Sequence, residues 1–239
     1  MNPTERLVLP DAEALARHAA EFLTTTLAAT PGRSAVALSG GSTPKRLYEL
    51  LATPEFRDRL PWERVHWFWG DERFVPQDNP DSNYRMTRLA MLASVPVPPG
   101  HVHAVPVAGL DPVPAAASYE AELQRFYGAA ALDPGRPLFD IVLLGLGEDG
   151  HTASLFPGTA ALGERHHWVA AVLGAKPEPR VSLTYPALDS ARHVMFLVAG
   201  AGKRAVLDRL AQGEDLPAGH VRPVGTLHWL LDRAADQGN

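Results

Sequence analysis

Short apolar runs alternate along the chain with longer stretches in which apolar and polar positions recur at helical spacing. The runs are typical of buried strands and cover residues 35–38, 65–69, 139–144, 169–172, 181–184 and 194–198. The amphipathic stretches predict helices over residues 11–29, 44–51, 83–92, 114–127, 203–210 and 227–234. Continuous apolar strands that alternate with helices indicate an α/β fold with a mostly parallel sheet covered on both faces, a three-layer α/β/α arrangement.

The length and composition favour one folded unit. The chain has 239 residues, 46% of them hydrophobic, which is enough to bury a full core. No long linker, internal repeat or low-complexity tract divides it, so we expect a single domain over residues 1–239. Cysteine is absent, which excludes disulfides, thiolate metal ligands and a cysteine nucleophile, and fits the reducing cytoplasm, where we expect the protein.

Charge and hydropathy limit the kinds of partner. The chain carries 27 acidic against 22 basic residues, so a broad nucleic-acid surface is not expected. No apolar run approaches the ~20 residues of a membrane span. The first ten residues also lack the basic and apolar regions of a secretory signal. A small molecule is the expected partner.

A glycine-rich segment follows the apolar run 35–38 and opens the predicted helix 44–51. Glycines there expose backbone N–H groups, Ser42 or Thr43 can cap the helix, and Pro44 suits its first position. Free N–H groups at a helix start, with hydroxyls nearby, form a natural phosphate cradle. The candidate phosphate ligands are Gly40, Gly41, Ser42 and Thr43. The alternative is a well-capped turn without a ligand, and the role of the nearby Lys45 stays open.

Charged residues follow the second apolar run directly, as Asp71, Glu72 and Arg73. In an open parallel sheet, ligands bind beyond the carboxyl ends of the strands. Two carboxylates and an arginine at such an end could perform acid–base chemistry or orient an anion. The alternative is a solvated ion pair in a loop.

The most hydrophobic run, residues 139–144, leads into Gly-Leu-Gly-Glu-Asp-Gly-His-Thr. This contains G-x-G-x-x-G, but the dinucleotide fingerprint normally opens the first βαβ unit and has an acidic residue about 20 positions later, which this chain lacks. Asp149 and His151 are the more informative pair, because a carboxylate can hold an imidazole in the tautomer that accepts a proton. A lone histidine, by contrast, is more often structural or merely exposed.

Two further cations stand at predicted strand edges, Arg180 before residues 181–184 and Lys203 at a helix start. A lysine at a helix start opposes the helix dipole, so an anion nearby would explain it. The alternative is a long side chain in water. The remaining histidine pairs, 101/103 and 166/167, lack the spacing and extra ligands of a zinc site, so no metal is expected.

Four stretches, taken in order, resemble the glucosamine-6-phosphate isomerase/6-phosphogluconolactonase family. They read LSGGSTPKRLYELL (38–51), WERVHWFWGDERFVPQDNPDSNYRM (62–86), FDIVLLGLGEDGHTASLFPG (139–158) and RVSLTYPALDSARHVMFLVAGAGKRAVL (180–207). The resemblance implies a Rossmann-like α/β/α domain of the glucosamine-6-phosphate deaminase/ribose-5-phosphate isomerase type. It also implies hydrolysis of 6-phospho-D-glucono-1,5-lactone in the pentose phosphate pathway, without a cofactor.

The resemblance suggests a role for each candidate. His151 would be the general base, oriented by Asp149, while Arg73 would stabilise the oxyanion or align hydroxyls. Asp71 would bind sugar hydroxyls or position the histidine. The phosphate would lie on residues 40–43, with Arg180 and Lys203 supplying charge.

Position 156 bears on the choice of reaction. Deaminases of this fold carry a glutamate five residues after the corresponding histidine, and this chain has Phe156 there. This favours the lactonase over a sugar-phosphate deaminase or isomerase, while a sugar-phosphate sensor without catalysis is the non-enzyme alternative.

We expect the protein to be a monomer or a weak homodimer.

Overall fold

The computed structural model describes residues 3–236, and its main sheet is fully parallel. The strand order across this sheet is β1 (Thr4–Leu9), β9 (Thr226–Asp232), β8 (Ala191–Val198), β5 (Phe139–Leu144), β2 (Ser34–Leu38) and β3 (Val65–Trp69). A smaller antiparallel sheet has the order β4 (Asp71–Arg73), β7 (Arg180–Leu183) and β6 (Val169–Val172).

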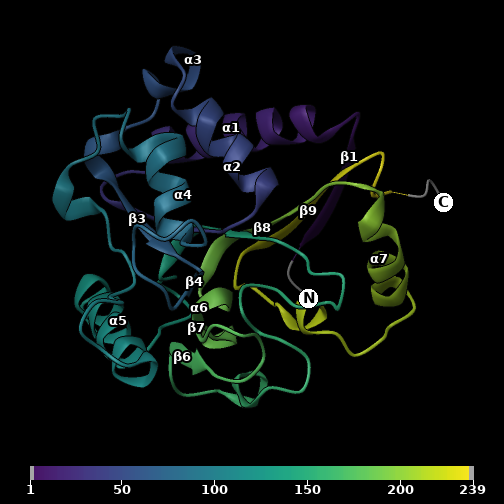
Figure 1. Cartoon of the computed structure of the whole chain (residues 1–239). Helices are drawn as coiled ribbons and strands as arrows, with labels where there is room; N and C mark the ends of the chain where they lie inside the picture. The colour runs from purple at the N-terminus through teal and green to yellow at the C-terminus, as the bar shows by residue number, and fades with distance from the viewer. Residues whose placement is uncertain (1–2, 237–239) are drawn as a thin grey trace.

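Helices cover both faces of the main sheet, and Figure 1 shows α1, α2 and α4 on one side and α5 and α7 on the other. The helices are α1 (Ala12–Ala29), α2 (Ser42–Leu51), α3 (Pro54–Arg57), α4 (Asn83–Thr87), α5 (Pro112–Tyr127), α6 (Tyr185–Asp189) and α7 (Arg204–Ala211). Two neighbours on β9 show the layering. His228 packs against Phe22 of α1, whereas Trp229 lines a groove with Leu207 and Leu210 of α7. Successive side chains of a strand point to opposite faces, so the predicted three layers are confirmed.

Helix α1 shows how the sequence builds this architecture. The Asp11 carboxylate caps the helix by accepting a hydrogen bond from the Ala14 N–H at 2.8 Å. Its buried residues recur at helical spacing and form one stripe, Leu15, Ala16, Ala19, Ala20, Leu23, Thr24 and Leu27. No helix among residues 3–236 is both long enough and apolar enough to cross a bilayer.

The direction of strand succession reverses between β5 and β2, and the two strands also separate there. Their ladder ends at the pair Ala37–Val142, whereas β2 stays paired with β3 as far as Leu38–Trp69. A reversal of this kind leaves a crevice at the carboxyl ends of the strands, which is where ligands bind in open α/β sheets.

One sequence prediction about the strands was wrong. Residues 227–234 were expected to form a helix, but residues 226–232 are β9, a central strand with most of its side chains buried. A strand buried on both faces reads as a continuous apolar run, and periodicity cannot separate it from a buried helix. The predicted strands 169–172 and 181–184 are confirmed as β6 and β7, which pair with each other in the antiparallel sheet.

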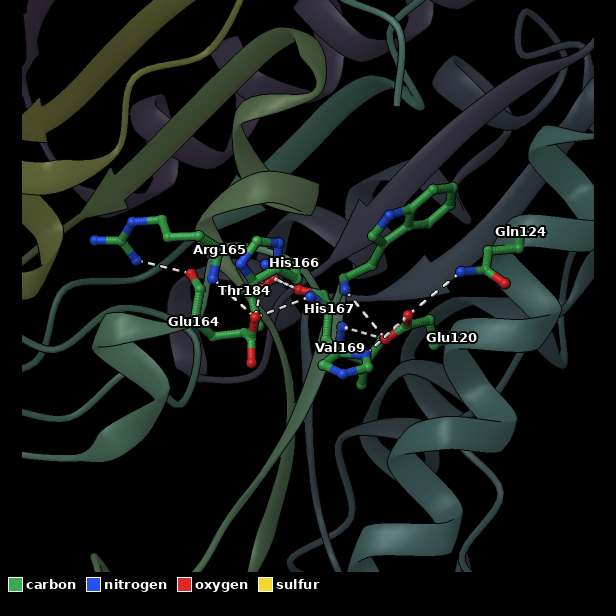
Figure 2. Close-up of polar contacts among 9 residues, drawn as sticks. Glu120, Gln124, Glu164, Arg165, His166, His167, Val169 and Thr184 are labelled. Carbon is green, nitrogen blue, oxygen red and sulfur yellow. Dashed lines mark hydrogen bonds and ion pairs between the residues drawn. The ribbon is translucent and has the colours of Figure 1, made fainter. Parts of the chain in front are cut away.

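Figure 2 shows how the chain before β6 is fastened to α5. The Glu120 carboxylate of α5 accepts hydrogen bonds from the backbone N–H groups of Trp168 and Val169, at 3.1 and 3.3 Å. Glu164 folds back and accepts three successive N–H groups, those of Arg165, His166 and His167. These backbone hydrogen bonds lower the pKa of Glu164. The loop that begins after β5 is therefore held at its far end.

A histidine cluster covers the outer edge of β3. His66 Nδ1 lies 2.9 Å from His103 Nε2, and His103 Nδ1 lies 2.8 Å from a carboxylate oxygen of Glu122. His101 stacks on His66 with ring centroids 4.0 Å apart. Burial and the neighbouring imidazoles lower the pKa of His66 to about 4, and burial lowers that of His103. The folded protein therefore holds the His66 ring neutral at neutral pH.

This cluster predicts acid sensitivity of the fold. An unfolded histidine has a pKa near 6.5. Below that pH the unfolded chain therefore binds a proton at residue 66, whereas His66 in the folded protein stays neutral. The contribution of His66 to the free energy of unfolding is therefore fully present above about pH 6.5. It is lost progressively as the pH falls towards about 4. The unfolding free energy of the parent minus that of His66→Phe should therefore fall between pH 7.5 and 4.5. Denaturant unfolding at each pH measures it, with exposed His166→Gln as control, and a pH-independent difference would contradict the prediction.

Candidate active site

A cavity of about 370 Å³ lies at the carboxyl ends of the separated strands. Nearly all the site residues predicted from the sequence line this cavity. The predicted residues that line it are Gly40, Gly41, Ser42, Thr43, Asp71, Arg73, His151, Arg180 and Lys203. Asp149 is not part of this lining, but it contacts the cavity through His151.

The segment 40–43 forms the start of α2. The helix begins at Ser42, and Gly41 is its N-cap with a φ of 104°, a conformation that favours glycine. No side chain caps this end, so the expectation that Ser42 or Thr43 would do so is wrong. Pro44 is the third helical residue rather than the first. The hydroxyls and the first N–H groups of α2 are consequently left available to a ligand.

Asn83 holds this segment against β4. Its side-chain amide donates to the backbone carbonyl of Asp71 at 2.9 Å, and it is 3% exposed. A methyl group added at Gly40 would lie 2.1 Å from Asn83 Oδ1, so only glycine fits there. Two segments far apart in the sequence thus meet at one buried amide.

Glu72 proves to be structural. One carboxylate oxygen accepts the N–H groups of Arg73 and Asn83, both at 2.7 Å. The other accepts the Ser82 hydroxyl and the Tyr84 N–H. Burial raises the pKa of Glu72, and the four hydrogen bonds oppose that rise. The side chain fastens the start of α4, so of the two adjacent carboxylates only Asp71 serves the cavity.

Asp71 is buried and held by a serine from the loop after β5. Its Oδ2 accepts a hydrogen bond from Ser154 Oγ at 2.6 Å. Ser154 is itself 1% exposed, and its N–H donates to the Ser182 hydroxyl on β7. The carboxylate therefore has a fixed orientation at the cavity wall.

Two arginines face each other across the small sheet, because Arg73 of β4 is directly opposite Arg180 of β7. Like charges directly opposite in an antiparallel pair destabilise the sheet. Arg73 donates to the backbone carbonyl of Asp81, at 2.6 Å. Arg180 Nη1 is buried without a hydrogen-bond partner among the described residues; it lies 3.8 Å from Glu178, and Asp71 is a further counter-charge. Burial and the Arg73 charge lower the pKa of Arg180. This pair is suited to an anion.

His151 and Asp149 form the expected pair. His151 Nδ1 lies 2.5 Å from Asp149 Oδ1, and the same oxygen accepts the His151 backbone N–H at 3.1 Å. Burial raises the pKa of Asp149, but the hydrogen bonds and charge of His151 outweigh it and lower the pKa overall. Gly147 packs on the imidazole so closely that a methyl group there would lie 2.0 Å from Nδ1. The ring's Nδ1 is thereby committed to the carboxylate, and Nε2 is the free nitrogen.

Two of the three lysines line the cavity. Lys203, in the turn Ala201–Lys203, lines the cavity as expected. Lys45, whose role the sequence left open, lies on the α2 surface outside the cavity lining, 3.9 Å from Glu49. Lys176 also lines the cavity, with Nζ 5.1 Å from the centre of the Phe156 ring, which packs 4.5 Å from the His151 ring.

Sequence reasoning missed three side chains at this cavity, those of Asn83, Ser154 and Lys176. Asn83 and Ser154 stand within stretches that carry the family resemblance, so the signal was present but unassigned. Lys176 lies in a loop without a periodic pattern. Within residues 3–236, no cluster of three histidine or carboxylate side chains could hold a metal ion.

Known proteins share both the sequence and the fold. A family model described as glucosamine-6-phosphate isomerases/6-phosphogluconolactonase matches residues 10–229. The chain is 46% identical to 6-phosphogluconolactonase of Nostoc sp. over 237 residues, covering 95% of both chains. Its structure is similar to that of Thermotoga maritima 6-phosphogluconolactonase, with a TM-score of 0.82, 30% identity, and coverage of 96% of this chain and 100% of that one.

A monomeric glucosamine-6-phosphate deaminase shares the fold with a TM-score of 0.80 at 22% identity, covering 97% of this chain and 98% of that one. The predicted α/β fold of the deaminase type is therefore confirmed. The length of the family match and the identity to the Nostoc relative lead to one conclusion. The chain belongs to the glucosamine-6-phosphate isomerase/6-phosphogluconolactonase family.

Proposed function

We propose that the protein hydrolyses 6-phospho-D-glucono-1,5-lactone to 6-phospho-D-gluconate, in the oxidative pentose phosphate pathway and without a cofactor. One observation carries this proposal: the His151–Asp149 pair opens onto the same cavity as the arginine pair Arg73 and Arg180. A proton acceptor and an anion site within about 370 Å³ suit a small sugar phosphate. The names of the Nostoc and Thermotoga relatives support the same reaction.

The phosphate would bind at the start of α2. The N–H groups of residues 40–43 and the Ser42 and Thr43 hydroxyls supply donors, and the helix dipole favours an anion there. Arg180 and Lys203 add positive charge from two other strand ends. Each charge-assisted hydrogen bond would contribute about 1.5–3 kcal/mol, which holds the lactone carbonyl near the imidazole.

His151 would act as the general base. With Nδ1–H donated to Asp149, Nε2 takes a proton from a water molecule as its oxygen attacks the lactone carbonyl carbon. The carbonyl π bond opens to an oxyanion. When the oxyanion collapses, the bond to the ring oxygen breaks and that oxygen takes the proton back from Nε2. The product is the open-chain acid, which ionises at neutral pH.

Arg73 and Asp71 would complete the site. Arg73 would stabilise the oxyanion or align hydroxyls, a role supported by its position in the cavity lining opposite Arg180. Asp71 uses Oδ2 to bind Ser154, which leaves Oδ1 to accept a hydrogen bond from a sugar hydroxyl. Asp149 would orient the imidazole without touching the carbonyl.

His151→Ala should lower kcat by about 100-fold or more, because a positioned general base contributes that much. The assay follows freshly made lactone, coupled to 6-phosphogluconate dehydrogenase, with spontaneous hydrolysis subtracted. His166→Ala, an exposed histidine on the loop before β6, is the control. A kcat for His151→Ala within a few-fold of the parent would exclude His151 as the base. Ligand binding by a parent that shows no turnover would instead indicate a sensor.

Arg180→Ala and Lys203→Ala should each raise KM by about tenfold with a smaller change in kcat, because each removes a charge-assisted contact to the phosphate. Lys45→Ala is the matched lysine control, since Lys45 lies on α2 outside the cavity. Arg192→Ala, which removes a surface pair with Asp140, is the arginine control. Unchanged KM in both site variants would place the phosphate elsewhere.

Glucosamine 6-phosphate should release no ammonia when incubated with the protein. The side chain five residues after His151 is Phe156, which packs on the imidazole and offers no carboxylate for ring opening. An ammonia assay at enzyme concentrations that hydrolyse the lactone within minutes tests this expectation. Ammonia release above the rate of a heat-inactivated sample would favour the deaminase.

A further inference from the structure

Two buried tyrosines bind backbone groups at the carboxyl ends of β2 and β3, those of Ser39, which follows β2, and of Trp69, the last residue of β3. The Tyr48 hydroxyl accepts the Ser39 N–H at 2.9 Å and donates to the Ser39 carbonyl at 2.8 Å. The Tyr119 hydroxyl does the same for Trp69, at 2.8 and 3.0 Å. Neither side chain is more than 1% exposed, and neither takes part in the chemistry proposed above.

The positions of these backbone groups explain why they need a hydroxyl. The Gly70 N–H binds the Leu38 carbonyl, so the N–H and carbonyl of Ser39 point to the other side, towards β5. The ladder with β5 has already ended at Ala37. Trp69 is on the last strand of the sheet, and its groups point outward. A hydroxyl is both donor and acceptor, so it can satisfy both groups at once.

Each tyrosine thereby fixes the origin of one segment of the site. Ser39 directly precedes residues 40–43, and Tyr48 is on α2, the helix that these residues open. The Tyr48 hydroxyl therefore connects the end of β2 directly to α2, across the loop between them. Trp69 precedes Gly70 and β4, which carries Asp71 and Arg73, and Tyr119 ties that origin to α5.

We propose that Tyr48 and Tyr119 are positioning residues with separate tasks: Tyr48 sets the phosphate-binding segment 40–43, and Tyr119 sets β4 with Asp71 and Arg73. The inference rests on the proposed lactonase function. It predicts that removing each hydroxyl changes a different kinetic constant, whereas a general loss of stability would change neither constant selectively.

The test compares Tyr48→Phe and Tyr119→Phe with a matched control, Tyr127→Phe. The Tyr127 hydroxyl also bridges an N–H and a carbonyl, those of Asp133 and Arg136, but in a turn outside the cavity. Tyr48→Phe should raise KM for the lactone about tenfold with kcat within about twofold, because the phosphate loses its aligned donors. Tyr119→Phe should lower kcat about tenfold with little change in KM.

Tyr127→Phe should leave both constants unchanged, even where its melting temperature falls as far as those of the other two variants. Parallel changes of kcat and KM in Tyr48→Phe and Tyr119→Phe, or no change in either, would overturn the proposal. If a variant fails to fold, hydrogen exchange in the parent decides. The Ser39 and Trp69 amides must exchange as slowly as the amides of the central strands, and fast exchange at both would overturn it.

If the parent protein does not hydrolyse the lactone, the proposed function is refuted, but the inference about Tyr48 can still be tested. In that case, calorimetry with inorganic phosphate replaces the kinetic assay. Tyr48→Phe should then bind phosphate about tenfold more weakly than Tyr127→Phe, because the same donors are displaced. Equal affinities would reject the positioning role.

Discussion

Separating two strands of a buried sheet opens a cavity, but it also leaves backbone amides and carbonyls that must find partners. This requirement shapes the whole site. Where β2 leaves β5, Tyr48 takes over the hydrogen bonds that the ladder no longer makes. Tyr119 does so at the outer edge of β3, and Glu72 satisfies the N–H groups that open α4. The loops can therefore diverge around a ligand while these backbone groups stay paired.

The electrostatics of the cavity follow from the same arrangement. The chain is acidic overall, with a formal net charge of −5, yet its carboxylates at the site are all engaged: Asp71 by Ser154 and Asp149 by His151. The small antiparallel sheet places Arg73 opposite Arg180, and Arg180 Nη1 has no hydrogen-bond partner among the described residues. A bound anion next to Arg180 would offset the repulsion between the two cations, which favours a phosphorylated ligand.

The sequence predicted what depends on local pattern and missed what depends on contacts. Buried strands with a glycine-rich or charged segment after them, such as β2 and β5, were correctly placed, because both signals are local. Residues 226–232 were mistaken for a helix, since a strand covered on both faces has no alternation to read. Lys45 and Lys176 could not be ranked from the sequence, because their distance from the cavity is set by the fold.

The environment of His151 also limits the chemistry that the site can perform. Asp149 fixes one ring nitrogen, Gly147 holds the ring from one side, and Phe156 covers it at 4.5 Å without offering a second proton carrier. Lactone hydrolysis needs one proton taken from water and one returned to the ring oxygen, and a single nitrogen can do both in turn. An aldose–ketose rearrangement needs protons moved between several atoms by more than one group. The apolar neighbour of the imidazole is therefore as informative about the reaction as its acidic one.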